Sequence, residues 1–123
     1  MTAPRRVSQV DHLLPLKPVA FQILLSLAGG ERHGYAISQD IAERTAAHSR
    51  VVLRIEPGNL YRSLKAMLDD GLIEESSRRP ASDLDDQRRR YYLITPLGSR
   101  VAAAETARLE AVVAEARRRW SRA

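Results

Sequence analysis

The stretch from Glu56 to Glu75, EPGNLYRSLKAMLDDGLIEE, limits the fold of this chain more than any other feature. Pro57 suits the first turn of a helix, and Gly71 suits the point where a helix stops. The apolar pair after Gly71 opens a segment that is typical of a β-strand. The sequence therefore predicts a short helix that is followed directly by a strand.

At about 100° per residue, this predicted helix has one apolar face and one polar face. The apolar face carries Leu60, Leu64, Met67 and Leu68. The polar face carries Gly58, Asn59, Arg62, Lys65 and Ala66. A short, flat polar face suits a helix that enters the major groove of DNA, because bulky residues would hold it away from the base edges. An ordinary amphipathic surface helix shows the same pattern, so both interpretations stay open at this point.

Two strand-like segments follow the helix, LIEESSRR and RRRYYLIT, and the polar segment PASDLDDQ separates them. Three helices followed by a β-hairpin is the element order of a winged helix, a helix-turn-helix variant whose hairpin touches DNA beside the recognition helix. Strand pairing would gather five arginines into one basic patch, namely Arg78, Arg79, Arg88, Arg89 and Arg90. Basic runs are also common on solvated faces, but the position beside the reading helix favours a DNA contact.

The expected hairpin tip carries acids, Asp83, Asp85 and Asp86, which DNA phosphates would repel. We therefore expect the arginines at the base of the hairpin to touch the DNA backbone. Alternatively, the aspartates neutralise neighbouring arginines in the free protein.

Two helices are expected before this unit. The first begins near Pro18 and ends at Gly29-Gly30, with apolar residues at helical spacing between them. The second lies in HGYAISQDIAERT, where Ile37 and Ile41 face inward. Its outward face is expected to carry Gln39, Asp40, Glu43 and Arg44. The next segment, AAHSRVVLRI, fits either a loop or a short strand.

A long helix is predicted at the C-terminal end, with Thr95 as its N-cap and Pro96 as its first residue. An apolar stripe runs along it, composed of Leu97, Val101, Ala104, Leu109, Val112, Val113, Ala116 and Trp120. One small domain offers too little surface to cover such a stripe, so we expect it to form the interface of a homodimer. The alternative is a helix that folds entirely onto its own domain.

Composition narrows the function further. A net charge of +5 and a pI of about 10.2 favour a polyanion as partner, with nucleic acid first and an anionic membrane surface second. No apolar run approaches the roughly 18 residues that span a bilayer, and the first residues lack a signal-peptide core. The absence of cysteine fits the reducing cytoplasm. The sequence shows no nucleophile–base pair, phosphate loop or metal-ligand spacing, so we expect neither an enzyme nor a metal or cofactor site.

Three segments carry a resemblance to a known family: RHGYAI, GNLYRSLKAMLDDGLIEE and RRRYYLITPLGSR. In this order and spacing they resemble the PadR family of bacterial transcriptional regulators, and the length resembles its short class with one C-terminal helix. The resemblance implies a mainly α fold with a small β-hairpin, that is, a winged helix-turn-helix with a long C-terminal dimerisation helix. It further implies a homodimeric repressor that binds a palindromic double-stranded DNA operator. In some members a small hydrophobic effector releases the operator.

The resemblance assigns Tyr35 to the second helix, Asn59, Tyr61 and Arg62 to the recognition helix, and the arginines before Tyr91 to the wing. Asn59 stands where the family usually has threonine, and Arg62 where proline is frequent. Asn59 can pair with adenine, so the preferred operator is expected to differ.

The expected DNA-binding set outside the five hairpin arginines is Tyr35, Ser38, Gly58, Asn59, Tyr61, Arg62, Ser63 and Lys65. We expect an N-terminal arm at 1–14, the winged helix-turn-helix domain at 15–95 and the dimerisation helix at 96–123. The alternative function is a winged-helix module that contacts proteins without binding specific DNA.

Overall fold

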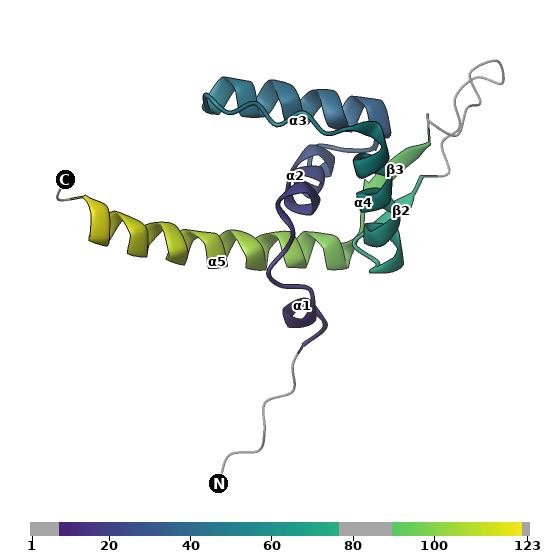
Figure 1. The fold of residues 1–123 in the computed structure, drawn as a ribbon. Coiled ribbons are helices and arrows are strands. Elements are labelled where there is room, and N and C mark those ends of the chain that lie inside the picture. The colour runs from purple at the N-terminus through teal and green to yellow at the C-terminus, as the bar shows by residue number, and fades with distance from the viewer. Residues whose placement is uncertain (1–7, 77–89, 122–123) are drawn as a thin grey trace, which may run out of the picture.

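The structure, a computed structural model, describes residues 8–76 and 90–121. In chain order its elements are α1 (Gln9–His12), α2 (Pro18–Leu27), β1 (Arg32–His33), α3 (Gly34–His48), α4 (Pro57–Asp69), β2 (Ile73–Glu75), β3 (Tyr91–Ile94) and α5 (Pro96–Trp120). Figure 1 shows α3 and α5 on opposite sides of α2, with α4 and the strands at one end. The predicted mainly helical fold with a small antiparallel sheet is confirmed.

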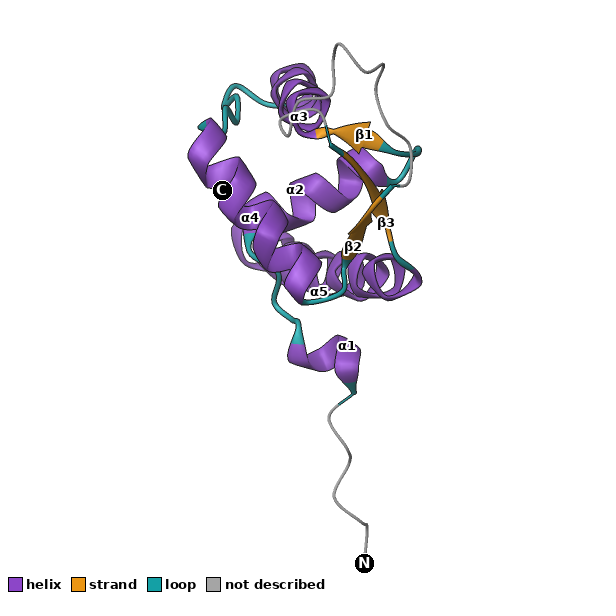
Figure 2. Ribbon diagram, turned by 90° about the vertical axis from the view of Figure 1, so that its right-hand side faces the viewer, coloured by secondary structure: helices purple, strands orange, loops and turns teal. Residues whose placement is uncertain are grey.

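The sheet has three strands in the order β1-β3-β2 (Figure 2). β2 pairs antiparallel with β3, with Ile73 opposite Ile94, as expected for the hairpin. The additional strand, β1, pairs with the other edge of β3 and places Arg32 opposite Tyr92. β1 has two residues, too few for a periodic pattern, so the sequence alone did not predict it. Of the segment 46–55, which fitted either a loop or a strand, residues 46–48 form the end of α3 and residues 49–55 are a loop.

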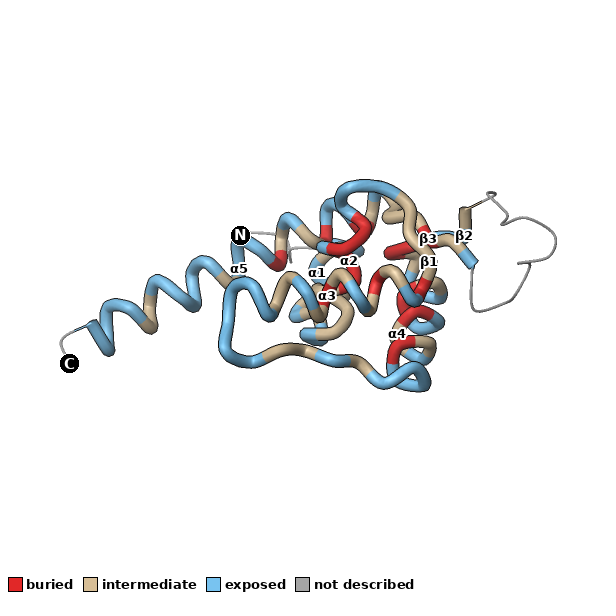
Figure 3. Tube along the Cα trace, turned by 90° about the horizontal axis from the view of Figure 1, so that it is seen from above, coloured by how far each residue is buried: buried red, intermediate tan, exposed pale blue. Residues whose placement is uncertain are grey.

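The core lies where α2, α3, α4, the sheet and the first half of α5 meet. Its fully buried side chains include Ile23, Leu27, Ile37, Leu64 and Val101. Burying each such side chain stabilises the fold by about 1.5–3 kcal/mol. Figure 3 shows that the buried positions stop partway along α5 and that its C-terminal half is largely exposed.

The start of α5 is tied to the end of α4. The Thr95 hydroxyl donates to the Gly71 carbonyl oxygen at 2.6 Å and accepts from the Gly98 amide at 3.0 Å. The predicted cap at Thr95 is therefore confirmed, and its second bond fixes the direction in which α5 leaves the sheet.

Part of the expected N-terminal arm packs on the domain. Ser8 and Asp11 form a capping box that starts α1, and Val10 and Leu13 pack against the core. The Leu16 amide donates to the buried carboxylate of Glu105 at 3.2 Å, which fastens the segment after α1 to α5. The apolar residues of this segment cover core side chains that would otherwise meet water.

Asp40 and Arg44 do not face solvent as expected. The Ser26 hydroxyl donates to Asp40 at 2.7 Å, and Arg44 donates to both Asp40 and Ser26. Burial opposes ionisation of Asp40, but the bonds from Ser26 and Arg44 outweigh it and lower its pKa. The prediction was wrong because Ser26 is buried and polar, and its partners must come from the facing helix.

Candidate nucleic-acid interface

The exposed face of α4 is short and polar, as the sequence predicted. Leu60, Leu64 and Met67 are buried. Gly58, Asn59, Arg62, Lys65 and Ala66 are exposed. Pro57 occupies the first turn and starts the helix without a side-chain cap. The first turns of α4 therefore present small and polar groups to solvent above an apolar underside.

The two cations on this face lack partners within the described residues. Arg62 and Lys65 form no ion pair or hydrogen bond there, whereas Arg44, Arg108 and Arg119 each pair with an acid. An atom placed as a Cβ on Gly58 would lie 3.5 Å from Nη1 of Arg62, so the guanidinium lies over Gly58. Free guanidinium and ammonium groups beside small residues can approach phosphates or base edges at short range.

Tyr35 extends from the start of α3 and is 63% exposed. Its hydroxyl accepts a hydrogen bond from the Gln39 amide at 2.6 Å, and its ring stacks with His33 at 6.4 Å. Because the hydroxyl accepts from Gln39, its own hydrogen remains available to an outside acceptor. The Ser38 hydroxyl is directed to the Tyr35 carbonyl oxygen at 2.9 Å.

Tyr61 and Ser63 are less accessible than the other residues of the expected set. Tyr61 is half-buried, and its hydroxyl lies 3.1 Å from where a Cβ on Gly34 would be. The ring thus fills the space between the starts of α3 and α4, which positions α4. Ser63 is half-buried and lines a groove between α4 and residues 12–20.

Of the five hairpin arginines, Arg90 is described. It is exposed and donates to Glu75 at 3.0 Å, which joins the two strands at the base of the hairpin. The other four, Arg78, Arg79, Arg88 and Arg89, lie outside the described residues. On β3, Tyr92 is buried and Tyr91 meets His33 edge-on at 5.5 Å, so the two tyrosines face opposite sides as expected. Burial raises the pKa of the Tyr92 phenol.

The apolar stripe of α5 divides into two parts. Val101 is fully buried in the core of its own domain and Leu97 packs against that core. The assignment of Val101 to a dimer interface was wrong, because a residue with no exposed surface has none to bury on association. The stripe pattern could not separate core from interface, since both demand apolar residues at the same spacing.

The second part of the stripe is open. Val112, Val113 and Trp120 are 52%, 47% and 76% exposed, whereas Ala104, Leu109 and Ala116 are half-buried. Phe21 on α2 lines an apolar hollow of about 440 Å³ with Leu109 and Val113 of α5. This face of α2 and α5 has no covering element among residues 8–76 and 90–121.

Sequence reasoning missed Arg50 and Arg54, in the loop between α3 and α4. Both are exposed, and neither has a hydrogen-bond or ion-pair partner in the described part of the chain. The signal was present in SRVVLRIEPG, where two arginines precede the proline that starts α4.

Two other kinds of site are absent from the described residues. They contain no group of three side chains that could hold a metal ion. None of their helices combines the length and the apolar character needed to cross a bilayer.

Comparisons with known proteins agree with this geometry. Residues 23–104 match the transcriptional regulator PadR-like family. A PadR family transcription regulator from Clostridium difficile R20291 superposes with a TM-score of 0.63 at 19% identity, covering 85% of this chain and 98% of that one. A transcriptional regulator from Clostridium thermocellum gives a TM-score of 0.63 at 25% identity, covering 83% of this chain and 88% of that one.

A structure of Bacillus subtilis PadR was solved in complex with operator DNA. It gives a TM-score of 0.59 at 22% identity, with coverage of 72% of this chain and 46% of that chain. No curated protein sequence matches this chain significantly. The family match extends from α2 into α5 and includes the whole of α3 and α4. The chain therefore belongs to the PadR-like family of transcriptional regulators, which are DNA-binding proteins.

Proposed function

We propose that this protein is a homodimeric repressor that binds a palindromic operator and inserts the first turns of α4 into the major groove of each half-site. The observation that carries the proposal is the exposed face of α4, where Asn59, Arg62 and Lys65 have no partner among residues 8–76 and 90–121 and lie beside Gly58. Arginine can donate twice to guanine and asparagine can pair with adenine, so this face can distinguish base pairs. The expected wing arginines would add backbone contacts that do not depend on sequence.

The dimer is supported by the apolar face of α2 and α5. Val113 and Trp120 are exposed on it, and Phe21 borders the hollow between the two helices. A second copy that packs the same face would bury these side chains, and its twofold axis would match a palindromic operator. The hollow is also where we place a small hydrophobic effector, which would release the operator by changing the spacing of the two recognition helices. The protein would act in the cytoplasm as a regulator without catalytic activity.

The test is selection of bound duplexes from a random-sequence DNA pool at two salt concentrations. We expect a symmetric motif whose half-sites are separated by about one helical turn or a multiple of it. Affinity for the selected duplex should fall by roughly 10³ to 10⁵ between 50 and 200 mM salt if about six to ten phosphates are contacted. A pool with no enriched sequence and no salt-dependent retention would favour a protein-contact module instead.

A further inference from the structure

A second concave surface lies beside α4. The loop 49–56 runs back along α3 to the start of α4, as Figures 1 and 3 show. The Leu53 amide donates to the Thr45 hydroxyl at 2.9 Å, which holds the loop against α3. Between them is an open groove of about 400 Å³.

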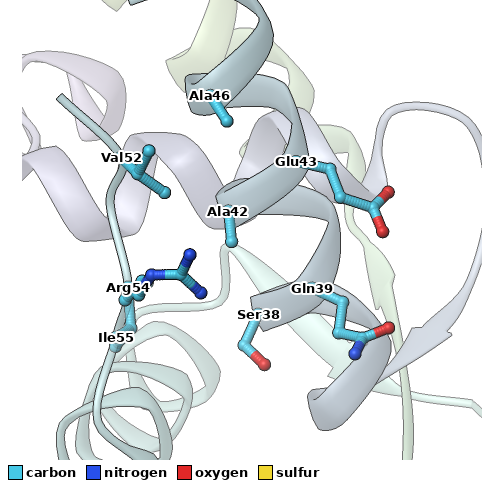
Figure 4. Close-up of a pocket in the computed structure, with 8 residues that line it drawn as sticks. All are labelled: Ser38, Gln39, Ala42, Glu43, Ala46, Val52, Arg54 and Ile55. Atoms are coloured by element: carbon cyan, nitrogen blue, oxygen red, sulfur yellow. The ribbon is translucent and has the colours of Figure 1, made fainter. Parts of the chain in front are cut away.

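Figure 4 shows how the side chains of this groove lie. The guanidinium of Arg54 projects from the loop across the groove toward Ala42 on α3. Ser38 and Gln39 lie at the end of the groove nearer the start of α3. Glu43 also borders the groove, but its carboxylate points away from Arg54.

Within the described residues, this arrangement leaves Arg54 unpaired. No acid of the described residues forms an ion pair with it, and the walls near its guanidinium include the methyl groups of Ala42 and Val52. An arginine so placed offers its planar set of donors to an outside anion. The Ser38 hydroxyl also borders the groove and can rotate away from its own helix, whereas the Gln39 amide points away from Arg54 and donates to the Tyr35 hydroxyl.

The position of the groove indicates which anion would bind beside Arg54. Arg54 precedes Pro57, the first residue of α4, by three positions, so it moves with the N-terminal end of the reading helix. A helix that lies in the major groove is flanked by the phosphates of both strands. An anion carried by the same DNA would therefore reach Arg54 when Arg62 reaches the base edges.

We propose that the groove between α3 and residues 49–56 receives one phosphodiester of the operator backbone, held by the Arg54 guanidinium with the Ser38 hydroxyl as a neighbouring donor. This contact rests on the proposed DNA-binding function. It adds no sequence information, but it fixes the depth and register of α4 in the major groove. An arginine fork suits this task because it can donate two parallel hydrogen bonds to the phosphate oxygens.

The experiment measures the affinity of the full chain for two duplexes, one enriched from the random pool and one of scrambled sequence, over a series of salt concentrations. The variants are Arg54→Ala and Ser38→Ala. Arg100→Ala is the matched control, because Arg100 is also exposed and without a partner in the described residues but lies on α5. Thermal melting confirms that each variant is folded.

We expect Arg54→Ala to weaken binding to both duplexes by about the same factor, roughly tenfold, and to reduce the slope of log affinity against log salt by about 2, because each subunit of the dimer loses one phosphate contact. Ser38→Ala should have a smaller effect in the same direction, and Arg100→Ala should change neither quantity. Neutral methylphosphonates placed one at a time along the enriched duplex should reveal one position in each half-site that weakens the native protein but not Arg54→Ala.

Different failures have different meanings. Native protein that binds neither duplex removes the proposed function and this contact with it. Normal binding by Arg54→Ala overturns the contact alone. If Arg54→Ala lost affinity for the enriched duplex only, Arg54 would read a base and not a phosphate. If inorganic phosphate at matched ionic strength competed with DNA in the native protein but not in Arg54→Ala, the groove would be a free-phosphate site, and the assignment to the DNA backbone would be wrong.

Discussion

Helices α4 and α5 are both amphipathic, yet their exposed faces differ in chemistry. The exposed face of α4 carries Arg62 and Lys65, which have no acid partner among the described residues. The C-terminal half of α5 exposes Val113 and Trp120, while Arg118 and Arg119 both pair with Glu115. One helix leaves charge unpaired, and the other neutralises part of its charge and leaves apolar surface uncovered.

This difference indicates two separate partners. Unpaired cations beside small polar residues favour a polyanion, and an uncovered apolar face favours another protein surface. Because the faces lie on different helices, substitutions should affect DNA reading and self-association independently. The connection between the helices is the exception, since both depend on it.

A substitution in the connection between α4 and α5 should cause the largest loss of stability. A Cβ on Gly98 would lie 2.1 Å from the Leu72 carbonyl oxygen and 2.9 Å from Cγ1 of Ile94, so α5 would have to move away from Leu72, just before β2, and from the end of β3. We expect Gly98→Ala to lower the free energy of unfolding by about 3 kcal/mol or more, measured by urea denaturation. Gly29→Ala is the control, because a Cβ at Gly29 meets nothing within 4 Å. Equal stability of the two variants would show that α5 approaches Leu72 and Ile94 less closely than described.

The second largest effect is expected on dimerisation, from substitutions in the exposed half of α5. The double substitution Val112→Asp with Val113→Asp should weaken dimerisation by about 100-fold or more, because charges would be buried at an apolar interface. Sedimentation equilibrium measures this directly. Ala111→Asp adds one aspartate at an exposed position roughly 160° from Val113 about the helix axis and should leave the dimer intact. A double variant that still dimerises fully would place the interface elsewhere.

The boundary between the two halves of α5 is marked by Glu105. Hydrogen bonds from Arg108 hold the pKa of this carboxyl below its ordinary value, and burial opposes them only in part. A lowered folded-state pKa means that the carboxylate stabilises the fold above its ordinary pKa of 4.5 and that this contribution is lost as the pH falls further.

Glu105→Gln should therefore lower the free energy of unfolding at neutral pH by about 1–3 kcal/mol and flatten its dependence on pH below about 4.5. Urea denaturation across roughly pH 3 to 7 measures both the free energy of unfolding and its dependence on pH. Glu43→Gln, at an exposed acid of α3 without an ion pair in the described residues, is the control. A native protein whose stability is level through this range would contradict the role of Glu105.

The features that the sequence predicted correctly are those that depend on local periodicity. The faces of α4 followed from the spacing of Leu60, Leu64 and Met67, because one side of a helix must cover the core. The alternation of Tyr91 and Tyr92 followed from the period of a strand. These features depend on local periodicity, and both are confirmed.

The predictions were wrong where the environment of a side chain depends on residues that are distant in the sequence. Val101 fitted an interface stripe, but its partners in the core come from elements far earlier in the sequence. Asp40 and Arg44 fitted an exposed face until Ser26 on α2 supplied a buried polar group. Arg54 gave no periodic signal, because its position depends on how the loop 49–56 lies against α3. Whether the expected contacts on α4 are made remains a prediction.

The most direct test of the central claim, that the exposed face of α4 reads bases, compares affinities for the enriched and scrambled duplexes. We predict that Arg62→Ala and Asn59→Ala each reduce the difference between the two binding free energies, and hence the ratio of the two affinities, by about 1–3 kcal/mol in free energy, since each removes a contact with a base edge. Both variants should remain dimeric. If the ratio were unchanged in folded, dimeric Arg62→Ala and Asn59→Ala proteins, α4 would not be the helix that reads DNA.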